Sequence, residues 1–138
     1  MRRALGDGIE LDDDPERVDV DELHGFLSTE AYWALGRPRE TVERLVRQSE
    51  RVVGLYDHER LIGFCRAVTD GVAFVYLADV YVHPDYRGRG LSAELLREMI
   101  ENGPYADRKW LLHTEDAHGL YEKFGFAAPN YKLMERLP

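Results

Sequence analysis

The segment Val80-Tyr81-Val82-His83-Pro84-Asp85-Tyr86-Arg87-Gly88-Arg89-Gly90-Leu91-Ser92 joins an apolar stretch to an amphipathic one through two glycines. Residues Phe74 to Val82 are almost continuously apolar, which predicts a central strand covered on both faces. Leu91, Leu95 and Met99 follow at helical spacing and predict a helix with one buried face. Glycines let the backbone approach a ligand, and successive N–H groups at a helix N-terminus favour an anion. The segment therefore predicts a strand, a turn suited to phosphate groups, and a helix.

Arg87 and Arg89 in this turn would add charge-assisted hydrogen bonds to phosphate oxygens. Two familiar phosphate-binding patterns do not fit, because no Lys-Ser/Thr pair closes the turn and the three-glycine spacing of dinucleotide folds is not met. Taken alone, the turn does not identify a ligand, since a tight turn also needs glycine for steric reasons.

Before this unit the sequence predicts two helices and two antiparallel strands. Asp21 begins the first helix and Pro38 the second, because both residues suit a first turn. The strands are Arg51–Tyr56 and Arg60–Val68, separated by Asp57-His58-Glu59, a spacing typical of a hairpin.

Short strands are expected at three further places, Ile9–Leu11, Trp110–Thr114 and Tyr131–Met134, with a helix at Ala117–Phe124 between the last two. The resulting order is strand, two helices, three strands, helix, strand, helix, strand. This order predicts an α/β (α+β) fold in which a mixed sheet carries helices on both faces.

Composition favours one globular domain spanning residues 1–138, with 44% hydrophobic and 32% charged residues. No apolar run is long enough for a membrane span and the N-terminus lacks a signal peptide, so we expect a cytoplasmic protein without a membrane partner. Cys65 stands alone, which excludes an internal disulfide and a cysteine zinc site. The formal net charge of -8 argues against nucleic acid as a partner.

Two motifs resemble those of a known family. Arg87-Gly88-Arg89-Gly90-Leu91-Ser92 resembles the Arg/Gln-x-x-Gly-x-Gly/Ala acetyl-CoA signature of the GNAT family of N-acetyltransferases, and the residues before it match the family's Val-x-Pro-x-Tyr lead-in. Ala117 to Phe126 resembles the second motif, Ala-x-x-Leu-Tyr-x-Lys-x-Gly-Phe. The resemblance is specific from Leu77 to Phe126. It implies an acetyl-CoA-dependent N-acetyltransferase with a largely antiparallel sheet, splayed open at a cofactor cleft between the strands ending near Val82 and beginning near Trp110.

The resemblance also implies which residues hold acetyl-CoA, and it implies no metal. The pantetheine arm would bond to the backbone of Val80, Tyr81 and Val82 in the gap. Amides of the turn would hold the pyrophosphate, from Arg87, Gly88, Arg89, Gly90, Leu91 and Ser92. Ser92 replaces the usual Gly or Ala, and its hydroxyl would turn outward or cap the helix. Thr114 stands where many relatives carry an asparagine that touches the cofactor.

Tyr121 falls on the position of the family's frequent general acid, which would protonate the departing thiolate of coenzyme A. Without the motif, Tyr121 reads as a core aromatic on the same helical stripe as Leu120 and Phe124. A backbone N–H near Val80 would stabilise the oxyanion. The implied reaction is direct transfer to an amine, without a covalent enzyme intermediate.

The general base is harder to assign. A glutamate proposed as base in polyamine acetyltransferases is replaced here by Ala78. Asp79 is the substitute candidate, because burial in an apolar strand would raise its pKa; a structural hydrogen bond is the competing interpretation. Glu115, His113 and His118 are further candidates for relaying a proton.

The acceptor is expected to be a small-molecule amine, or a peptide, bound near Tyr32, Trp33 and Tyr76, although the first two would equally fill the edge of the core. No motif identifies this amine. Two alternatives stay open: transfer of another acyl group or to a protein amine, and an acyl-CoA-binding sensor without turnover. The apolar Tyr131–Met134 would permit a homodimer.

Overall fold

The computed structural model describes all residues from 1 to 138. Six strands form one sheet in sequence order, and every neighbouring pair is antiparallel except β5 and β6, which are parallel. The strands are β1 (Arg2–Gly6), β2 (Ile9–Asp12), β3 (Arg51–Asp57), β4 (Arg60–Thr69), β5 (Phe74–Val82) and β6 (Lys109–Leu111). The sheet is therefore mixed and largely antiparallel, as predicted.

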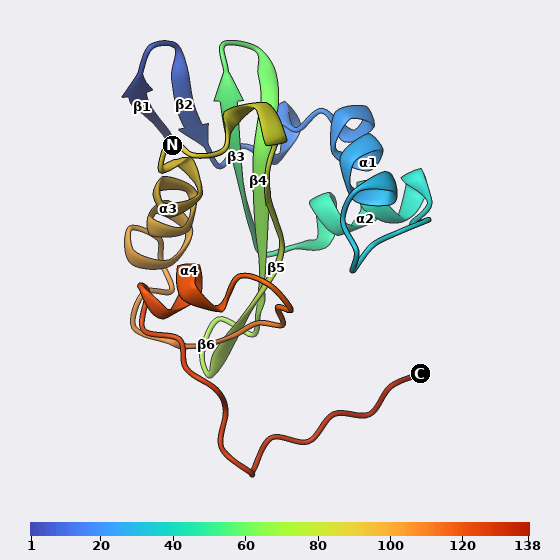
Figure 1. Cartoon of the computed structure of the whole chain (residues 1–138), viewed down its shortest axis with the longest axis vertical. Helices are drawn as coiled ribbons and strands as arrows, with labels where there is room; N and C mark the ends of the chain where they lie inside the picture. Colours follow the sequence, from blue (N-terminus) through green and yellow to red (C-terminus); the bar gives the residue numbers. More distant parts are fainter.

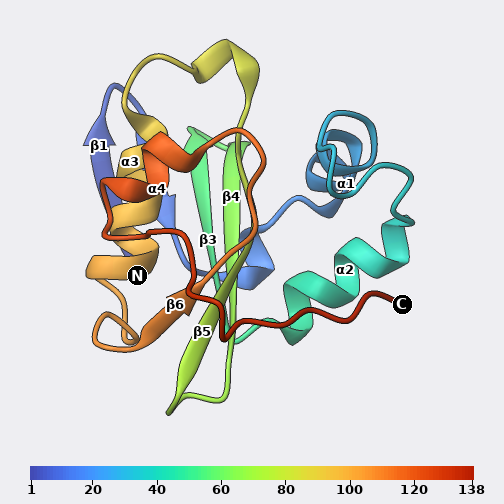
Figure 2. The ribbon, with the colours of Figure 1, turned by 60° about the horizontal axis from the view of Figure 1, so that its bottom comes forward.

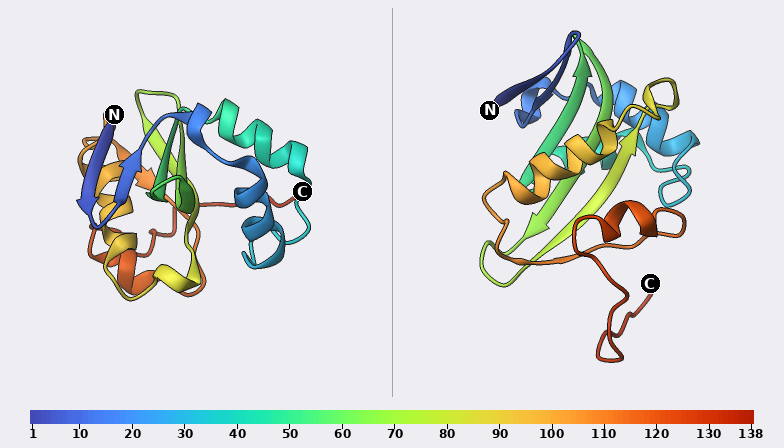
Figure 3. Two further views of the ribbon diagram at one scale, coloured as in Figure 1. Left: turned by 90° about the horizontal axis from the view of Figure 1, so that it is seen from above. Right: turned by 60° about the vertical axis from the view of Figure 1, so that its left-hand side comes forward.

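Helices cover both faces of this sheet (Figure 1). They are α1 (Val20–Thr29), α2 (Arg39–Gln48), α3 (Leu91–Leu96), which a π-helical turn continues over Arg97–Glu101, and α4 (His118–Glu122). Helices α1 and α2 lie on one side, and α3 and α4 lie on the other (Figure 3). None of these helices has both the length and the apolar character that crossing a bilayer requires.

The two faces of the sheet carry separate hydrophobic clusters, because side chains alternate along a strand. On β4, Cys65 and Ala67 pack with α3 residues such as Leu95, all fully buried. Phe64 points to the opposite face and packs with the α1 and α2 residues, Leu27 among them. The glycine-rich turn is thus attached to a helix that is anchored in the core.

The sheet opens between β5 and β6. Their parallel pairing covers only the first three residues of β5, from Phe74 opposite Lys109 to Tyr76 opposite Leu111. Strand β6 then ends while β5 continues to Val82. Figure 2 shows the two strands diverging. The splayed sheet expected from the family resemblance is confirmed.

A β-bulge interrupts β5 beside this opening. Phe64 of β4 is opposite Tyr81 and Arg66 is opposite Ala78, so β5 carries one more residue over this interval than β4 does. Asp79 within the bulge has a φ of 53°, the left-handed region that few non-glycine residues adopt. The bulge therefore re-aims the Asp79 side chain relative to a regular strand.

Two predictions at the N-terminus need correction. The chain forms an edge strand, β1, that we did not expect, because its side chains alternate between exposed and half-buried without an apolar run. Its signal was the Asp7-Gly8 pair, which takes positive φ in the hairpin turn. Helix α1 is capped by Asp19 rather than Asp21, with the Asp19 carboxylate accepting from the N–H of Glu22 at 3.1 Å.

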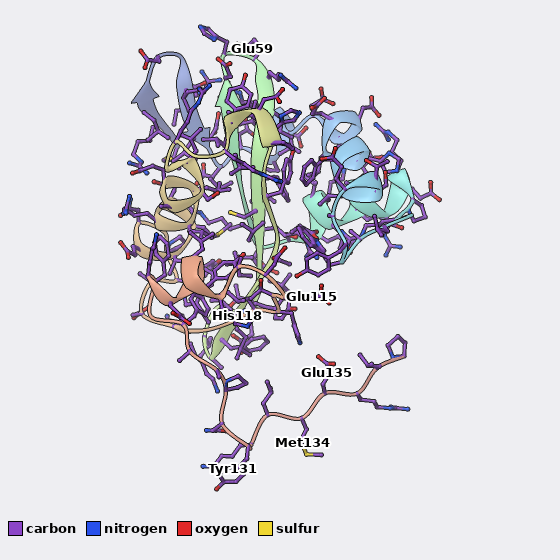
Figure 4. All side chains as sticks on the ribbon, in the orientation of Figure 1. Glu59, Glu115, His118, Tyr131, Met134 and Glu135 are labelled. Atoms are coloured by element: carbon purple, nitrogen blue, oxygen red, sulfur yellow. The ribbon has the colours of Figure 1, made fainter.

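The strand predicted at Tyr131–Met134 is wrong, since the chain has no strand after α4. The amides of Lys132 and Leu133 both donate to Asn130, so they cannot join a ladder. Tyr131 and Met134 lie exposed on an extended C-terminal tail (Figure 4).

Candidate active site

A cavity of about 290 Å³ lies where β5 and β6 separate. Its walls come from β5, from the loop between α1 and α2, from Arg66 of β4 and from the segment joining β6 to α4. The polar and aromatic side chains around it are Tyr32, Trp33, Arg37, Arg66, Tyr76, Asp79, His113, Thr114, Asp116 and Tyr121. We call it the β5–β6 cavity. It brings together the residues predicted for acceptor binding and for catalysis.

A larger cavity, of about 490 Å³, lies near the N-terminus, away from both family motifs. Several of its charged groups are paired within the chain: Arg51 contacts Glu98 at 3.5 Å and Asp13 at 3.4 Å. Glu98 also accepts from Arg3 at 2.9 Å. It lies away from the open edge of β5 and from the glycine-rich turn, so we place the candidate site in the β5–β6 cavity instead.

The turn before α3 exposes a row of backbone donors. Gly88 and Gly90 have φ values of 80° and 73°, and Gly90 is the N-cap of α3. The N–H groups from Gly88 to Ala93 have no hydrogen-bond acceptor in the chain. A Cβ at Gly90 would meet no atom within 4 Å, so the turn is open above this residue. Such a row of free amides at a helix N-terminus fits the oxygens of a pyrophosphate.

The side chains of this turn take different places. Arg87 turns back toward β5, and its Nε donates to the carbonyl of Val82 at 3.1 Å. Arg89 lies over the Tyr86 ring, 5.2 Å from its centroid. Leu91 is buried in the core. The Ser92 hydroxyl makes no hydrogen bond in the chain, so of its two predicted arrangements the helix cap is not formed. Arg87 is thus directed to the end of β5 and Arg89 to Tyr86, both beside the start of the row of amides.

The edge of β5 that faces the gap is available to a ligand. The N–H of His83 donates to Ile62 of β4, and the Tyr81 carbonyl also lies against β4, 3.0 Å from an ideal Cβ on Gly63. Backbone groups alternate in direction along a strand, so Val80 and Val82 face the gap. Of the three residues predicted to contact the pantetheine arm, these two offer backbone groups to it.

Asp79 is buried, and both of its carboxylate oxygens accept hydrogen bonds. Its Oδ2 accepts from Arg66 Nε at 2.7 Å and from Arg37 Nη1 at 2.9 Å, while Oδ1 accepts from Trp33 Nε1 at 2.8 Å. Burial alone would raise the pKa of Asp79, but the two guanidinium groups outweigh it, and the pKa is lowered. The predicted rise of this pKa is therefore wrong, and the contacts are those of the competing structural interpretation.

The aromatic pair Tyr32 and Trp33 holds the α1–α2 loop over the cavity. The Tyr32 hydroxyl accepts from the N–H of Glu115 at 2.7 Å, which ties this loop to the β6–α4 segment. Trp33 meets Tyr32 edge to face with ring centroids 5.1 Å apart. Both side chains are about 40% exposed, at 41% and 42%, so they line the cavity rather than fill the core.

Tyr121 of α4 lies between the β5–β6 cavity and a second cavity of about 280 Å³ under the C-terminal tail. Only 8% of the residue is exposed, and its hydroxyl has no hydrogen-bond partner in the chain. Burial, with smaller contributions from Cys65, Tyr32 and Asp116, raises the pKa of Tyr121 to about 12. The phenol therefore keeps its proton at neutral pH.

His113 is held between two groups at the cavity. The Tyr76 hydroxyl hydrogen-bonds to His113 Nδ1, and the Glu135 carboxylate of the tail contacts His113 Nε2 at 2.6 Å. Burial raises the pKa of Tyr76, so this phenol is also neutral at physiological pH. The sequence named Tyr76 and His113 separately but gave no indication of Glu135, which lies 22 residues from His113.

The remaining candidates lie at the margin. Thr114 lines both cavities, and its hydroxyl accepts from the N–H of Ala117 at 3.1 Å, so it caps the turn before α4. Glu115 and His118 are exposed (Figure 4), and neither lines the β5–β6 cavity. Arg37, which sequence reasoning missed, does line it.

Comparison with known proteins agrees with this architecture. Residues 48–128, more than half of the chain, match the family model described as acetyltransferase (GNAT) domain. A solved structure from Xanthomonas campestris pv. campestris, assigned to the GNAT family, superposes with a TM-score of 0.87 at 34% identity over 94% of this chain and 93% of its own. One from Deinococcus radiodurans, assigned as an acetyltransferase, gives 0.73 at 26% identity over 97% and 92%.

Sequence relatives point the same way. A protein of Gibberella zeae assigned as an acetyltransferase is 29% identical over 127 residues, 76% of this chain and 71% of its own length. An uncharacterized N-acetyltransferase of Porphyra purpurea is 27% identical over 130 residues, 87% of this chain and 74% of its own. The splayed sheet and the amide-lined turn define an acyltransferase of the N-acetyl class. The chain belongs to the GNAT family.

Replacing Asp79 by Asn tests whether its carboxylate is structural. The substitution leaves Arg37 and Arg66 without their anion, and we expect the free energy of unfolding to fall by about 3 kcal/mol at pH 7. Because the folded-state pKa of Asp79 is lowered, its contribution is present above the unfolded-state value of about 4 and lost as pH falls below it.

Urea denaturation at pH 7 and at successively lower pH measures both effects, with the exposed Asp107→Asn as control. A variant that is as stable as the parent but inactive would instead support Asp79 as the base.

Proposed function

We propose that the protein transfers the acetyl group of acetyl-CoA directly to the amine of a small molecule bound in the β5–β6 cavity. The observation that carries this proposal is the continuity of three features along one edge: the free amides from Gly88 to Ala93, the backbone of Val80 and Val82, and the cavity that ends at Tyr121. A long ligand with a pyrophosphate at one end and a thioester at the other fits this sequence of sites.

The donor would be held mainly by backbone groups. Amides of the turn suit the pyrophosphate, and Arg87 and Arg89 add positive charge at the turn. The open edge of β5 suits the amide groups of the pantetheine arm, as an added strand would bond there. Acetyl-CoA supplies a thioester, whose carbonyl carbon is the site of attack.

The transfer forms a bond between the acceptor nitrogen and the acetyl carbon and breaks the carbon–sulfur bond. Tyr121 would give its proton to the departing thiolate, since its phenol is neutral and lines the cavity. A primary ammonium loses two protons in the process. One restores the Tyr121 phenol, and the other leaves to solvent.

Removal of the first proton from the ammonium would run through Tyr76 and His113. The Tyr76 hydroxyl takes a proton from the amine, directly or through water, and passes its own to His113 Nδ1. The Glu135 carboxylate at Nε2 fixes the orientation of the imidazole. In this scheme the C-terminal tail supplies a carboxylate to the site, and Asp79 holds the cavity wall.

Donor binding is tested by a thermal-shift titration with acetyl-CoA, in the parent and in Gly90→Glu. A ligand that binds the native state raises the midpoint of thermal unfolding, and we expect this rise in the parent. A glutamate at residue 90 places a side chain and a negative charge over the free amides, so the rise should be lost.

Gly71→Glu is the matched control, because Gly71 also has a positive φ, of 79°, with open space above it, but lies in the β4–β5 turn. Its shift with acetyl-CoA should equal that of the parent. An unshifted parent would contradict the proposal.

Tyr121→Phe separates catalysis from binding. Loss of the phenolic proton should lower kcat by a factor of about 10² to 10⁴, while the thermal shift with acetyl-CoA persists. Release of the thiol, followed with a chromogenic disulfide, measures the rate. Tyr131→Phe on the exposed tail is the control and should keep the parent rate. Donor binding without thiol release from any amine in the parent would favour the acyl-CoA sensor.

His113→Gln tests the proton relay. We expect kcat to fall by a factor of about 10² at pH 7, with acetyl-CoA binding unchanged. The deficit should shrink at alkaline pH, where the amine is increasingly deprotonated without help. His58→Gln, in the exposed β3–β4 turn, is the control. A deficit that stays constant with pH would indicate a structural role for His113.

A further inference from the structure

The β5–β6 cavity has a positively charged wall on one side. Arg37 and Arg66 both donate to Oδ2 of Asp79, so two guanidinium groups share one carboxylate. Apart from a 3.5 Å contact of Arg66 Nη1 with Ser49, their other donor atoms have no acceptor in the chain, and none of these atoms is fully buried. Nε and Nη2 of Arg37 and Nη2 of Arg66 are therefore free to bind an anion at the cavity.

A free negative charge lies on another part of the cavity wall, the segment between β6 and α4. Asp116 lies on the segment between β6 and α4, lines the cavity, and makes no hydrogen bond or ion pair in the chain. Tyr121 and His113 belong to the same wall. The charged groups at the cavity are thus Arg37 and Arg66 with Asp79 between them, Asp116 on the β6–α4 segment, and the Glu135 carboxylate, which contacts His113 Nε2 at 2.6 Å.

We propose that the acceptor is a zwitterion, an amine that carries a carboxylate in the same small molecule, as amino acids do. This inference rests on the proposed function. Arg37 and Arg66 bind the carboxylate, because a guanidinium donates two parallel hydrogen bonds to it. Asp116 attracts the ammonium and holds it in the cavity that Tyr76, His113 and Tyr121 also line. The orientation presents the nitrogen, rather than the carboxylate, to the thioester.

Two observations argue for this class of acceptor over others. The cavity of about 290 Å³ is small, which suits an amino acid better than a folded protein surface. A polyamine would bring a second cation toward Arg37 and Arg66, where like charges repel. An amine that carries no anionic group would leave the free guanidinium donors at the cavity without a partner.

The experiment compares matched acceptors: L-amino acids, their primary amides, and the corresponding amines that lack the carboxyl group. Acetylation is measured by thiol release, and binding of the same compounds without acetyl-CoA is measured by thermal shift. We expect the KM of an acid to be at least about tenfold lower than that of its amide, the value of a charge-assisted hydrogen bond. The acid alone should stabilise the protein without acetyl-CoA.

Arg37→Gln should raise the KM for acids about tenfold more than the KM for amides, because losing the contact with Asp79 affects both classes whereas losing the free donors affects acids alone. The matched control is Arg39→Gln, two residues along, whose exposed side chain pairs with Asp21 outside the cavity. Asp116→Asn, an exposed site where folding is not at risk, should raise the KM of both acids and amides, with Asp107→Asn as its control.

Equal KM values for acids and amides in the parent, or an Arg37→Gln effect of the same size on both, would overturn the inference. In that outcome an intact shift with acetyl-CoA and turnover of amines would leave the proposed transferase standing. Conversely, a shift with amino acids that Arg37→Gln abolishes would support the zwitterion site even if no turnover were found.

Discussion

The parting of β5 from β6 after Leu111 is the constraint on which the rest of the site depends. A strand buried within a sheet normally has both edges paired, since unpaired backbone groups are costly away from water. Here the far half of β5 has a partner on the β4 side only, and Arg87 already reaches across to the Val82 carbonyl. That edge can accept a ligand that bonds as a strand does, and the turn before α3 continues the same line of donors.

Asp79 connects this opening to the other half of the site. The bulge at its positive φ turns its carboxylate toward the α1–α2 loop, where Trp33 and Arg37 bind it, while Arg66 binds it from β4. One buried anion therefore holds three chain segments together and forms a cavity wall. The same contacts lower its pKa, which suits a fixed counter-ion and works against taking a proton near neutral pH.

Local patterns in the sequence were sufficient for much of the fold. The apolar run of β5, the glycines before α3 and the stripe of α3 are features of consecutive residues, and all three form as predicted. The strand prediction for the tail was wrong because a local pattern does not show whether a neighbouring strand is available. Tyr131–Met134 is apolar enough for a strand, but the amides of Lys132 and Leu133 form a turn with Asn130. Strand β1 was missed for the opposite reason: it forms at the edge of the sheet, where a strand needs no apolar run.

The site shows the same division. The glycine-rich turn and Tyr121 belong to contiguous motifs, so they could be located from the sequence. Asp79, in contrast, pairs with Arg66 and Arg37, which are 13 and 42 positions away in the sequence. The periodicity of the sequence does not show which arginines pair with a buried carboxylate. Whether the pKa of that carboxylate is raised or lowered depends on this pairing. The positive charge proposed to bind the acceptor also comes from this pairing of Asp79 with Arg37 and Arg66. Asp79 neutralises one of the two guanidinium groups, so the other leaves an excess positive charge at the cavity that Asp116 also lines. A cavity with both a positive and a negative group favours an acceptor that carries both charges. This selectivity arises from the Asp79 cluster, which also stabilises the fold.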